Sequence, residues 1–292
     1  MGGLHGLALV AFAVALLAAL ASAFGYVLQH EGMQDVDVSL RKLHEVRRLL
    51  TGTPWLAGIG MMILGQLLSA VALSLGDLAL VEPAYAAMVL FALIIAAVWR
   101  RQALSAREWV GVVTMVIGIA GFVIAASPTG GHPQDVGLVP LLVAVGVILA
   151  ALLLLIKGPL PFHRATGLGI AAGILFGSQD ALTRRALTLL PAGPARLFTD
   201  FSPYALVAVA ASAILIAQAA FKLAPLAASL PGQSILEPLC GIALGAGLFG
   251  EQLRVSFLWS AIQVLTLAAM VVGLFLVATS PLVTAQEAPD TS

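Results

Sequence analysis

Long apolar stretches separated by short polar turns fill most of this chain, and they limit its fold more than any other feature does. A helix needs about 20 predominantly apolar residues to cross the hydrocarbon core of a bilayer. Stretches of this kind lie at 4–28, 53–75, 78–99, 108–126, 137–156, 165–183, 204–228, 232–249 and 256–279. Because a backbone in lipid must satisfy its own polar groups, these stretches predict an all-α polytopic membrane protein with about nine transmembrane helices.

Composition excludes several other classes of protein. Only 10% of the 292 residues are charged and 61% are hydrophobic, whereas a soluble domain carries about 25% charged residues. The net charge is zero, so nothing indicates a nucleic-acid partner, and membrane lipid is the expected surrounding. Cys240 is the single cysteine, which excludes an intrachain disulfide and a zinc site built on paired cysteines.

The first apolar stretch shares some features with a cleaved signal peptide, including Ala-Ser-Ala at 21–23. However, no Lys or Arg precedes the apolar run, and the run is longer than the usual core of a signal peptide. We therefore expect an uncleaved first helix, with cleavage as the alternative.

Basic residues are distributed unevenly between the loops. With nine spans, the odd-numbered loops carry nine Lys and Arg residues and the even-numbered loops carry four. Cytoplasmic loops are enriched in these residues. The bias predicts a multi-pass protein of the inner or plasma membrane with its N-terminus outside and its C-terminus in the cytoplasm. The largest basic group lies in the predicted cytoplasmic loop 30–52 and comprises Arg41, Lys42, Arg47 and Arg48.

The second half of the chain repeats features of the first half in the same order. Glu82-Pro83 and Glu237-Pro238 are 155 residues apart, and Trp109 and Trp259 are 150 apart. Spans 1–4 therefore correspond to spans 6–9, with span 5 as a connector. The odd offset of five spans places the two copies in opposite orientations in the membrane, an arrangement typical of secondary transporters.

This correspondence predicts two inverted four-helix repeats joined by one helix, a 4+1+4 arrangement. The first repeat covers 1–128, the connector helix with its loops 129–164, the inverted second repeat 165–281, and a polar disordered tail 282–292.

Several segments resemble a known superfamily. The segment GLFGEQLRVSFLW (247–259), with Pro238 earlier in the chain, is similar to the EamA-type repeat of the drug/metabolite transporter (DMT) superfamily. The first copy departs from that pattern, with Arg100-Arg101-Gln102 where the superfamily has Gly-Glu. The segment SLGDLALVEP (74–83) and the nine-span count look more like the NIPA-type magnesium transporter branch. The resemblance implies membrane transport and leaves the solute open.

Two carboxylates inside predicted spans are the first candidates for a binding or ion-coupling site. Glu82 lies toward the outer mouth and Glu237 toward the cytoplasmic mouth of the predicted bundle. An ionisable side chain at the membrane centre costs about 2.5–3.5 kcal/mol on insertion scales, and a partly desolvated carboxyl can exchange a proton near neutral pH. Pro83 and Pro238 each remove a backbone donor, which suits a helix break that lines a cavity. The alternative is that each Glu-Pro pair starts a helix at the membrane interface.

Further polar residues in the spans are candidates for the same cavity. Asp180 precedes Arg184 by one helical turn, so a salt bridge at a helix end is its alternative role. Lys222 is expected to snorkel to the cytoplasmic surface, and its alternative roles are binding of an anionic group and pairing with an acid. The remaining candidates, with interfacial anchoring or helix–helix hydrogen bonding as alternatives, are Gln29, Gln66 and Gln218.

Signature motifs of several enzyme and channel classes are absent from the sequence, which has no HExxH, no Walker loop, no GxSxG and no TVGYG. We expect no enzyme activity and no cofactor. We expect a secondary-type transporter that moves a small solute by alternating access, with or without proton coupling through Glu82 and Glu237. One alternative is a divalent-cation transporter in which these two residues bind Mg²⁺, an ion that prefers hard oxygen ligands. Another is a non-transporting integral membrane scaffold.

Overall fold

The computed structural model describes residues 2–34, 53–99, 101–128, 161–223, 226–247 and 249–281. Within these ranges the chain folds into helices joined by turns, without a β-strand. The helices are α1 (Gly2–Gln34), α3 (Thr53–Leu75), α4 (Leu78–Trp99), α5 (Ala106–Ala126), α7 (Pro161–Leu189), η1 (Leu190–Ala192), α8 (Pro194–Thr199), α9 (Ser202–Leu223), α10 (Leu226–Gly247) and α11 (Phe257–Ala278).

Five of the described helices are long and apolar enough to cross a membrane. Their apolar parts are Gly6–Leu28, Leu56–Leu75, Leu78–Trp99, Ala106–Ala126 and Phe257–Ala278. Large apolar side chains remain exposed on the outer faces of α5 and α11, among them Ile117, Ile124, Leu258 and Leu265. Such faces suit contact with lipid, and the structure fits the predicted all-α, multi-pass membrane protein.

Most predicted spans in the described ranges coincide with helices. The stretches 53–75 and 78–99 are α3 and α4, and they meet at the turn formed by Gly76 and Asp77. The predicted connector helix 137–156, the tail 282–292 and residues 35–52 of the predicted loop lie outside the described residues.

The predicted break at Pro231-Gly232 is wrong. The structure ends α9 at Leu223 and begins α10 at Leu226, so Pro231 and Pro238 both lie inside α10. Proline usually ends a helix because it lacks the N–H donor. It is tolerated inside membrane helices, where neighbouring helices and local adjustments satisfy the freed carbonyl. As a result, Glu237 lies in the middle of its helix and not near its start.

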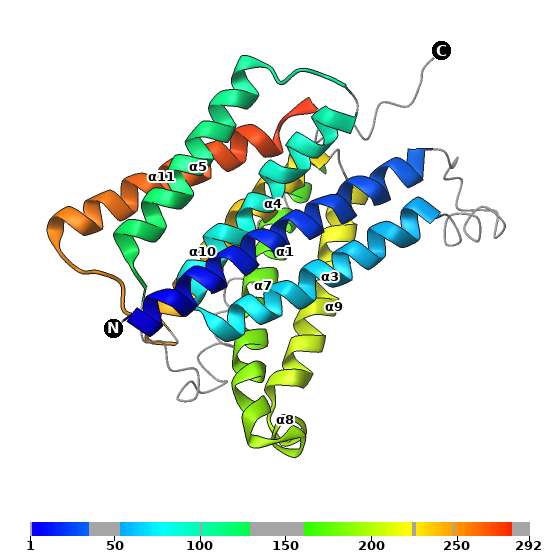
Figure 1. Cartoon of the computed structure of the whole chain (residues 1–292). Helices are drawn as coiled ribbons and strands as arrows, with labels where there is room; N and C mark the ends of the chain where they lie inside the picture. The colour runs from blue at the N-terminus through cyan, green and yellow to red at the C-terminus, as the bar shows by residue number, and fades with distance from the viewer. Residues whose placement is uncertain are drawn as a thin grey trace, which may run out of the picture.

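The helices pack in a regular pattern of pairs. α1 packs along α3 and α4, and α7 packs along α9 and α10. α4 and α10 contact each other, as do α5 and α11. In Figure 1, α4 lies between α1 and the α5–α11 pair. α4 is accordingly buried along most of its length, including every residue from Leu78 to Ala87, while Ile94 is exposed on its outer side.

α5 and α11 run antiparallel, so the start of each meets the end of the other. Near the start of α5, Arg107 Nη2 donates to Thr279 Oγ1 at 2.8 Å. At its other end, the backbone N–H of Arg254 donates to the carbonyl of Ala126 at 2.9 Å. Close approach between the two helices depends on Gly118 and Gly273, because a β-carbon on either would overlap the backbone of the other helix.

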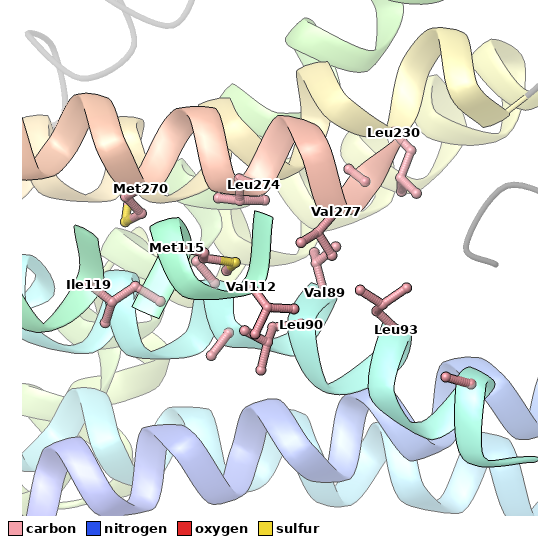
Figure 2. Close-up of a cluster of buried hydrophobic side chains, with 14 residues drawn as sticks. Val89, Leu90, Leu93, Val112, Met115, Ile119, Leu230, Met270, Leu274 and Val277 are labelled. Carbon is pink, nitrogen blue, oxygen red and sulfur yellow. The ribbon is translucent and has the colours of Figure 1, made fainter. Parts of the chain in front are cut away.

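A cluster of buried apolar side chains joins α4 to the α5–α11 pair (Figure 2). The labelled side chains in Figure 2 come from α4, α5, α10 and α11 and are Val89, Leu90, Leu93, Val112, Met115, Ile119, Leu230, Met270, Leu274 and Val277. Because lipid is as apolar as these side chains, they hold the helices together mainly by close van der Waals packing. This core fixes the position of α4 relative to α5 and α11.

Replacing Gly118 with alanine tests the close approach of α5 and α11. The added methyl group overlaps the backbone of Met270, and overpacking of this kind costs about 1–3 kcal/mol of unfolding free energy. Gly60→Ala is the matched control, because nothing lies within 4 Å of a β-carbon at Gly60. We expect chemical unfolding in detergent micelles, followed by circular dichroism, to show lower stability for Gly118→Ala alone. Equal behaviour of the two variants would contradict the packing described here.

Candidate functional site

Glu82 is a buried carboxyl in the second turn of α4. Its side chain is 2% exposed, and Oε1 has no hydrogen-bond partner among the described residues. Burying a carboxyl without a partner is costly unless it is protonated or binds a ligand. The structure therefore places Glu82 inside the helix bundle and not at a solvated helix start.

Asp180 on α7 and Glu237 on α10 converge on Glu82. Asp180 lies close enough to Glu82 for the two carboxyls to interact. Glu237 is close enough for its charge to act on both of them. Three acids from α4, α7 and α10 thus meet at one place, which we call the acid cluster.

A small pocket opens beside the acid cluster between α4 and α10. Its lining residues are Glu82, Tyr85, Ala86, Met88, Val89, Ser234, Glu237 and Pro238. About 20 Å³ is available to the centre of a water molecule, little more than the ~10–15 Å³ that one water requires. Glu82 and Glu237 therefore share one narrow pocket, and the prediction that each lies toward a separate mouth is wrong. The reason is the earlier start of α10, which carries Glu237 to the level of Glu82.

Tyr85 links the pocket to the helices behind it. Its hydroxyl lies 3.1 Å from Ser22 Oγ on α1 and accepts a long, 3.5 Å contact from Gln66 Nε2 on α3. Gln66 is thus connected to the pocket through Tyr85, although it does not line the pocket itself. Sequence patterns gave no reason to select Tyr85 or Ser22.

Gly241 makes room for the carboxyl of Glu82. A β-carbon on Gly241 would overlap the carboxyl group of Glu82. Gly177 on α7 allows a similar approach to α10, because a β-carbon there would lie 2.5 Å from the carbonyl oxygen of Glu237. The absence of side chains at these two positions lets α4, α7 and α10 meet closely enough to bring the acids together.

Arg184 pairs with residues other than Asp180. Its Nη2 lies 2.5 Å from Asp77 Oδ1, its Nη1 binds the carboxylate of Glu251, and its guanidinium carbon lies 5.8 Å from the centre of the Phe249 ring. The predicted alternative, a local salt bridge between Asp180 and Arg184 at a helix end, is wrong. α7 continues to Leu189, so both residues lie inside the helix and Arg184 reaches across to two other segments.

Glu251 also caps α4. Its two carboxylate oxygens accept the backbone N–H groups of Leu78 at 2.7 Å and Ala79 at 2.9 Å. These are the donors that a helix leaves unsatisfied at its N-terminus, where the helix dipole also favours a negative charge. We call Asp77, Arg184 and Glu251 the ion cluster. Its sequence signals were the Gly-Asp turn and the Gly-Glu pair at 250–251, but the sequence did not link them.

The adjacent pair formed by Arg185 and Asp200 lies outside the apolar spans. Arg185 Nη2 is 3.2 Å from Asp200 Oδ2, and the backbone N–H of Ser202 donates to Asp200 Oδ1 at 2.8 Å. Partial burial alone raises the pKa of Asp200, but the hydrogen bonds from Ser202 and Arg185 outweigh burial and hold that pKa below its ordinary value. This more exposed pair is a natural comparison for the ion cluster.

The remaining predicted site residues lie elsewhere or are not described. Pro238 lines the pocket, and Pro83 is buried in α4 beside Glu82. The backbones of Gln29, Gln218 and Lys222 belong to α1 and α9, but their side chains lie outside the described part of the chain. Within the described ranges, no group of three or more His, Cys, Asp or Glu residues is arranged to hold a metal ion.

Comparison with known proteins gives two distant relatives. The chain is 29% identical over 278 residues to an uncharacterized protein of Corynebacterium glutamicum, a match that covers 93% of this chain and 96% of that protein. It is 23% identical over 191 residues to "Probable magnesium transporter NIPA9" of Arabidopsis thaliana, covering 60% of this chain and 54% of the plant protein. No protein-family model matches the chain. No solved structure matches it either.

Substitution of Gly241 tests the close contact between α10 and the carboxyl of Glu82. We expect Gly241→Ala to displace the Glu82 carboxyl and lower the unfolding free energy by about 1–3 kcal/mol, as overpacking does. Gly247→Ala in the same helix is the control, since nothing lies within 4 Å of a β-carbon there. Chemical unfolding in detergent checks both variants, and a Gly241→Ala protein as stable as the control would show that α10 does not press on Glu82.

Removal of Arg184 tests whether the ion cluster stabilises the bundle. Arg184→Met leaves Glu251 buried without its cation, which we expect to cost about 3–5 kcal/mol of unfolding free energy. Arg185→Met removes a more exposed pair and should cost about 1 kcal/mol or less. The same unfolding assay compares the two, and a larger loss at Arg185 would reverse the assignment.

Proposed function

We propose that this protein is a secondary-type membrane transporter that moves a small cation by alternating access, and that the acid cluster is its binding and coupling site. The proposal depends on one observation, the buried carboxyl of Glu82, whose free oxygen lies at a pocket shared with Glu237 and close to Asp180. Intramembrane acids normally face a partner or a hydrated cavity and mark ion or substrate pathways.

The charge of the pocket favours a cation as cargo. Two of its lining residues are acids, and no described lining residue is Lys or Arg. Arg184, one turn from Asp180 along α7, is bound to Asp77 and Glu251 and does not neutralise the acids. A positively charged guest would supply the missing partner for Glu82.

Mg²⁺ is the first candidate for this cation. Mg²⁺ is usually bound by one or two carboxylates while it keeps several waters, so a small number of acids in a hydrated pocket suits it. The printed name of the plant relative, "Probable magnesium transporter NIPA9", supports the same choice. The pocket in this conformation has room for about one water, so entry of a hydrated ion requires α4 and α10 to move apart.

A proton-coupled organic solute is the second candidate. The closeness of Glu82 and Asp180 favours this reading, because neighbouring acids in a buried site are suited to take up and release a proton. Binding of a cationic guest would release that proton. Under either candidate, Glu82 and Asp180 bind and release a positive charge, either the metal ion or a proton, during each transport cycle.

The pairing of the helices supports the inverted-repeat architecture that alternating access uses. The α1–α3 and α1–α4 contacts correspond to α7–α9 and α7–α10, while α4 pairs with α10 and α5 with α11. The antiparallel course of α5 and α11 suits two copies of opposite orientation. We include in the proposal an inner or plasma membrane location, an N-terminus outside and a C-terminus in the cytoplasm.

Flux into proteoliposomes tests the function. We expect the purified protein to carry Mg²⁺ into vesicles that contain a fluorescent Mg²⁺ indicator. Glu82→Gln, Asp180→Asn and Glu237→Gln each remove a charged partner worth ~1.5–3 kcal/mol and should reduce the initial rate about ten- to hundredfold. Glu108→Gln is the control, because Glu108 is also buried but binds Ser105 and Ser280 away from the pocket.

The outcomes separate the candidates. Mg²⁺ flux that all three acid variants lose, and Glu108→Gln keeps, supports the first candidate. Organic solute flux that acidifies or alkalinises the vesicle, without Mg²⁺ movement, supports the second. A folded protein that moves neither would be the non-transporting scaffold and would refute the proposal.

A further inference from the structure

Three helices, α4, α7 and α10, carry the acid cluster. On each of them the ion cluster lies farther toward the same end of the bundle. Asp77 precedes Glu82 by five residues at the start of α4, and Arg184 follows Asp180 by four residues on α7. Glu251 follows the end of α10, the helix that carries Glu237. At 1.5 Å of rise per residue, the ion cluster is about 6–8 Å from the acids along α4 and α7.

The pocket extends away from the ion cluster. On α4 its lining continues from Glu82 to Val89, farther from Asp77 with each residue. On α10 it continues from Pro238 back to Ser234, farther from Glu251. The lining of the pocket therefore lies on the side of the acid cluster that faces away from the ion cluster.

A layer of buried apolar residues lies between the two clusters along α4 and α7. It contains Leu78 and Val81 of α4, Ala181 of α7 and Phe249, all buried and packed into one cluster. The Phe249 ring also lies beneath the guanidinium of Arg184. A layer of this kind excludes water, and the ion pairs above it join Arg184 on α7 to the α3–α4 turn and the segment after α10.

We propose that the ion cluster and the apolar layer beneath it form the seal over one mouth of the transport pathway, and that this seal opens and closes in each cycle. This inference rests on the transport function proposed above. Its physical basis is the energy balance of a buried ion pair, since the desolvation cost of the charges offsets much of their mutual attraction. Separating the paired charges and hydrating them therefore costs less free energy than exposing an apolar contact of the same size to water.

The rate at which a thiol reagent labels Cys240 can report whether the seal is open. It is the single cysteine of the chain, its thiol lies 3.8 Å from Ser178 Oγ, and it follows Pro238, which lines the pocket, by two residues on α10. A reagent must pass the seal to reach Cys240 from the ion-cluster side. Phe198→Cys in a Cys240→Ala background identifies that side, because Phe198 is 66% exposed on α8, beyond the end of α7.

The experiment measures the rate at which a membrane-impermeant, positively charged methanethiosulfonate labels Cys240 from each face of oriented vesicles. We expect the wild-type protein to react mainly from the face opposite the ion cluster. Asp77→Asn should speed labelling from the ion-cluster face about tenfold, the change that loss of a charged hydrogen bond of ~1.5 kcal/mol produces, and Arg184→Gln, which removes both ion pairs of Arg184, should speed it by more. Arg184→Lys keeps the charge and should restore most of the wild-type protection.

Arg185→Gln is the matched control, because it removes the neighbouring Arg185–Asp200 pair and leaves the seal intact. Circular dichroism shows whether each variant is folded. If Arg184→Gln does not fold, the milder Asp77→Asn variant alone carries the test. Equal labelling of the wild-type protein from both faces, or unchanged labelling in folded Asp77→Asn, would refute the seal. If the wild-type protein transports solute but the ion-cluster variants label at the wild-type rate, only the seal is refuted. If the variants label faster but the wild-type protein transports nothing, the transport function is refuted.

Discussion

The contact on which the rest of the structure depends is the acceptance of the first N–H groups of α4 by the carboxylate of Glu251. A helix that begins inside a bundle leaves its first donors without partners, and in a membrane no water is available to satisfy them. Glu251 supplies both oxygens and binds Arg184 at the same time. The start of α4 is therefore held by a residue more than 170 positions away in the chain, and the position of Glu82 follows from it.

α10 and the segment after it set the geometry of both clusters. Gly241 faces the carboxyl of Glu82, and Gly245, one turn later on the same face, faces the carboxylate of Glu251. A side chain at either glycine would occupy the space of a carboxyl group. One face of one helix therefore holds both a carboxyl with a free oxygen and a carboxylate that is fully engaged. A movement of α10 relative to α4 must change the surroundings of both acids together, and such a movement would couple the proposed binding site to the proposed seal.

The sequence predicted the helical membrane class, most helix bounds and two acids, Glu82 and Glu237, inside the helix bundle, because long apolar stretches and acids within them are local signals. It misplaced the start of α10, since Pro231-Gly232 is a turn signal in water but is tolerated where other helices surround the backbone. It also assigned Arg184 to Asp180, its nearest acid in the chain, whereas its partners are Asp77 and Glu251. The roles of Tyr85 and Gly241 depend on how α4, α1 and α10 are rotated about their axes, and no local pattern specifies that rotation.

The two clusters also explain how cargo could leave the site. While the seal is closed, Arg184 is bound to two carboxylates, and the acid cluster one turn away lacks a cation of its own. If the seal opens as proposed, Arg184 loses these partners and its guanidinium becomes the nearest positive charge to Asp180. If the charges are separated by about the ~6 Å of helix rise between Asp180 and Arg184, a unit charge at an effective dielectric constant of about 20 acts with ~3 kcal/mol, enough to weaken the binding of a cation about 100-fold. A single arginine between the mouth and the acids would then hold the mouth closed while cargo is bound and favour cargo release once the mouth is open.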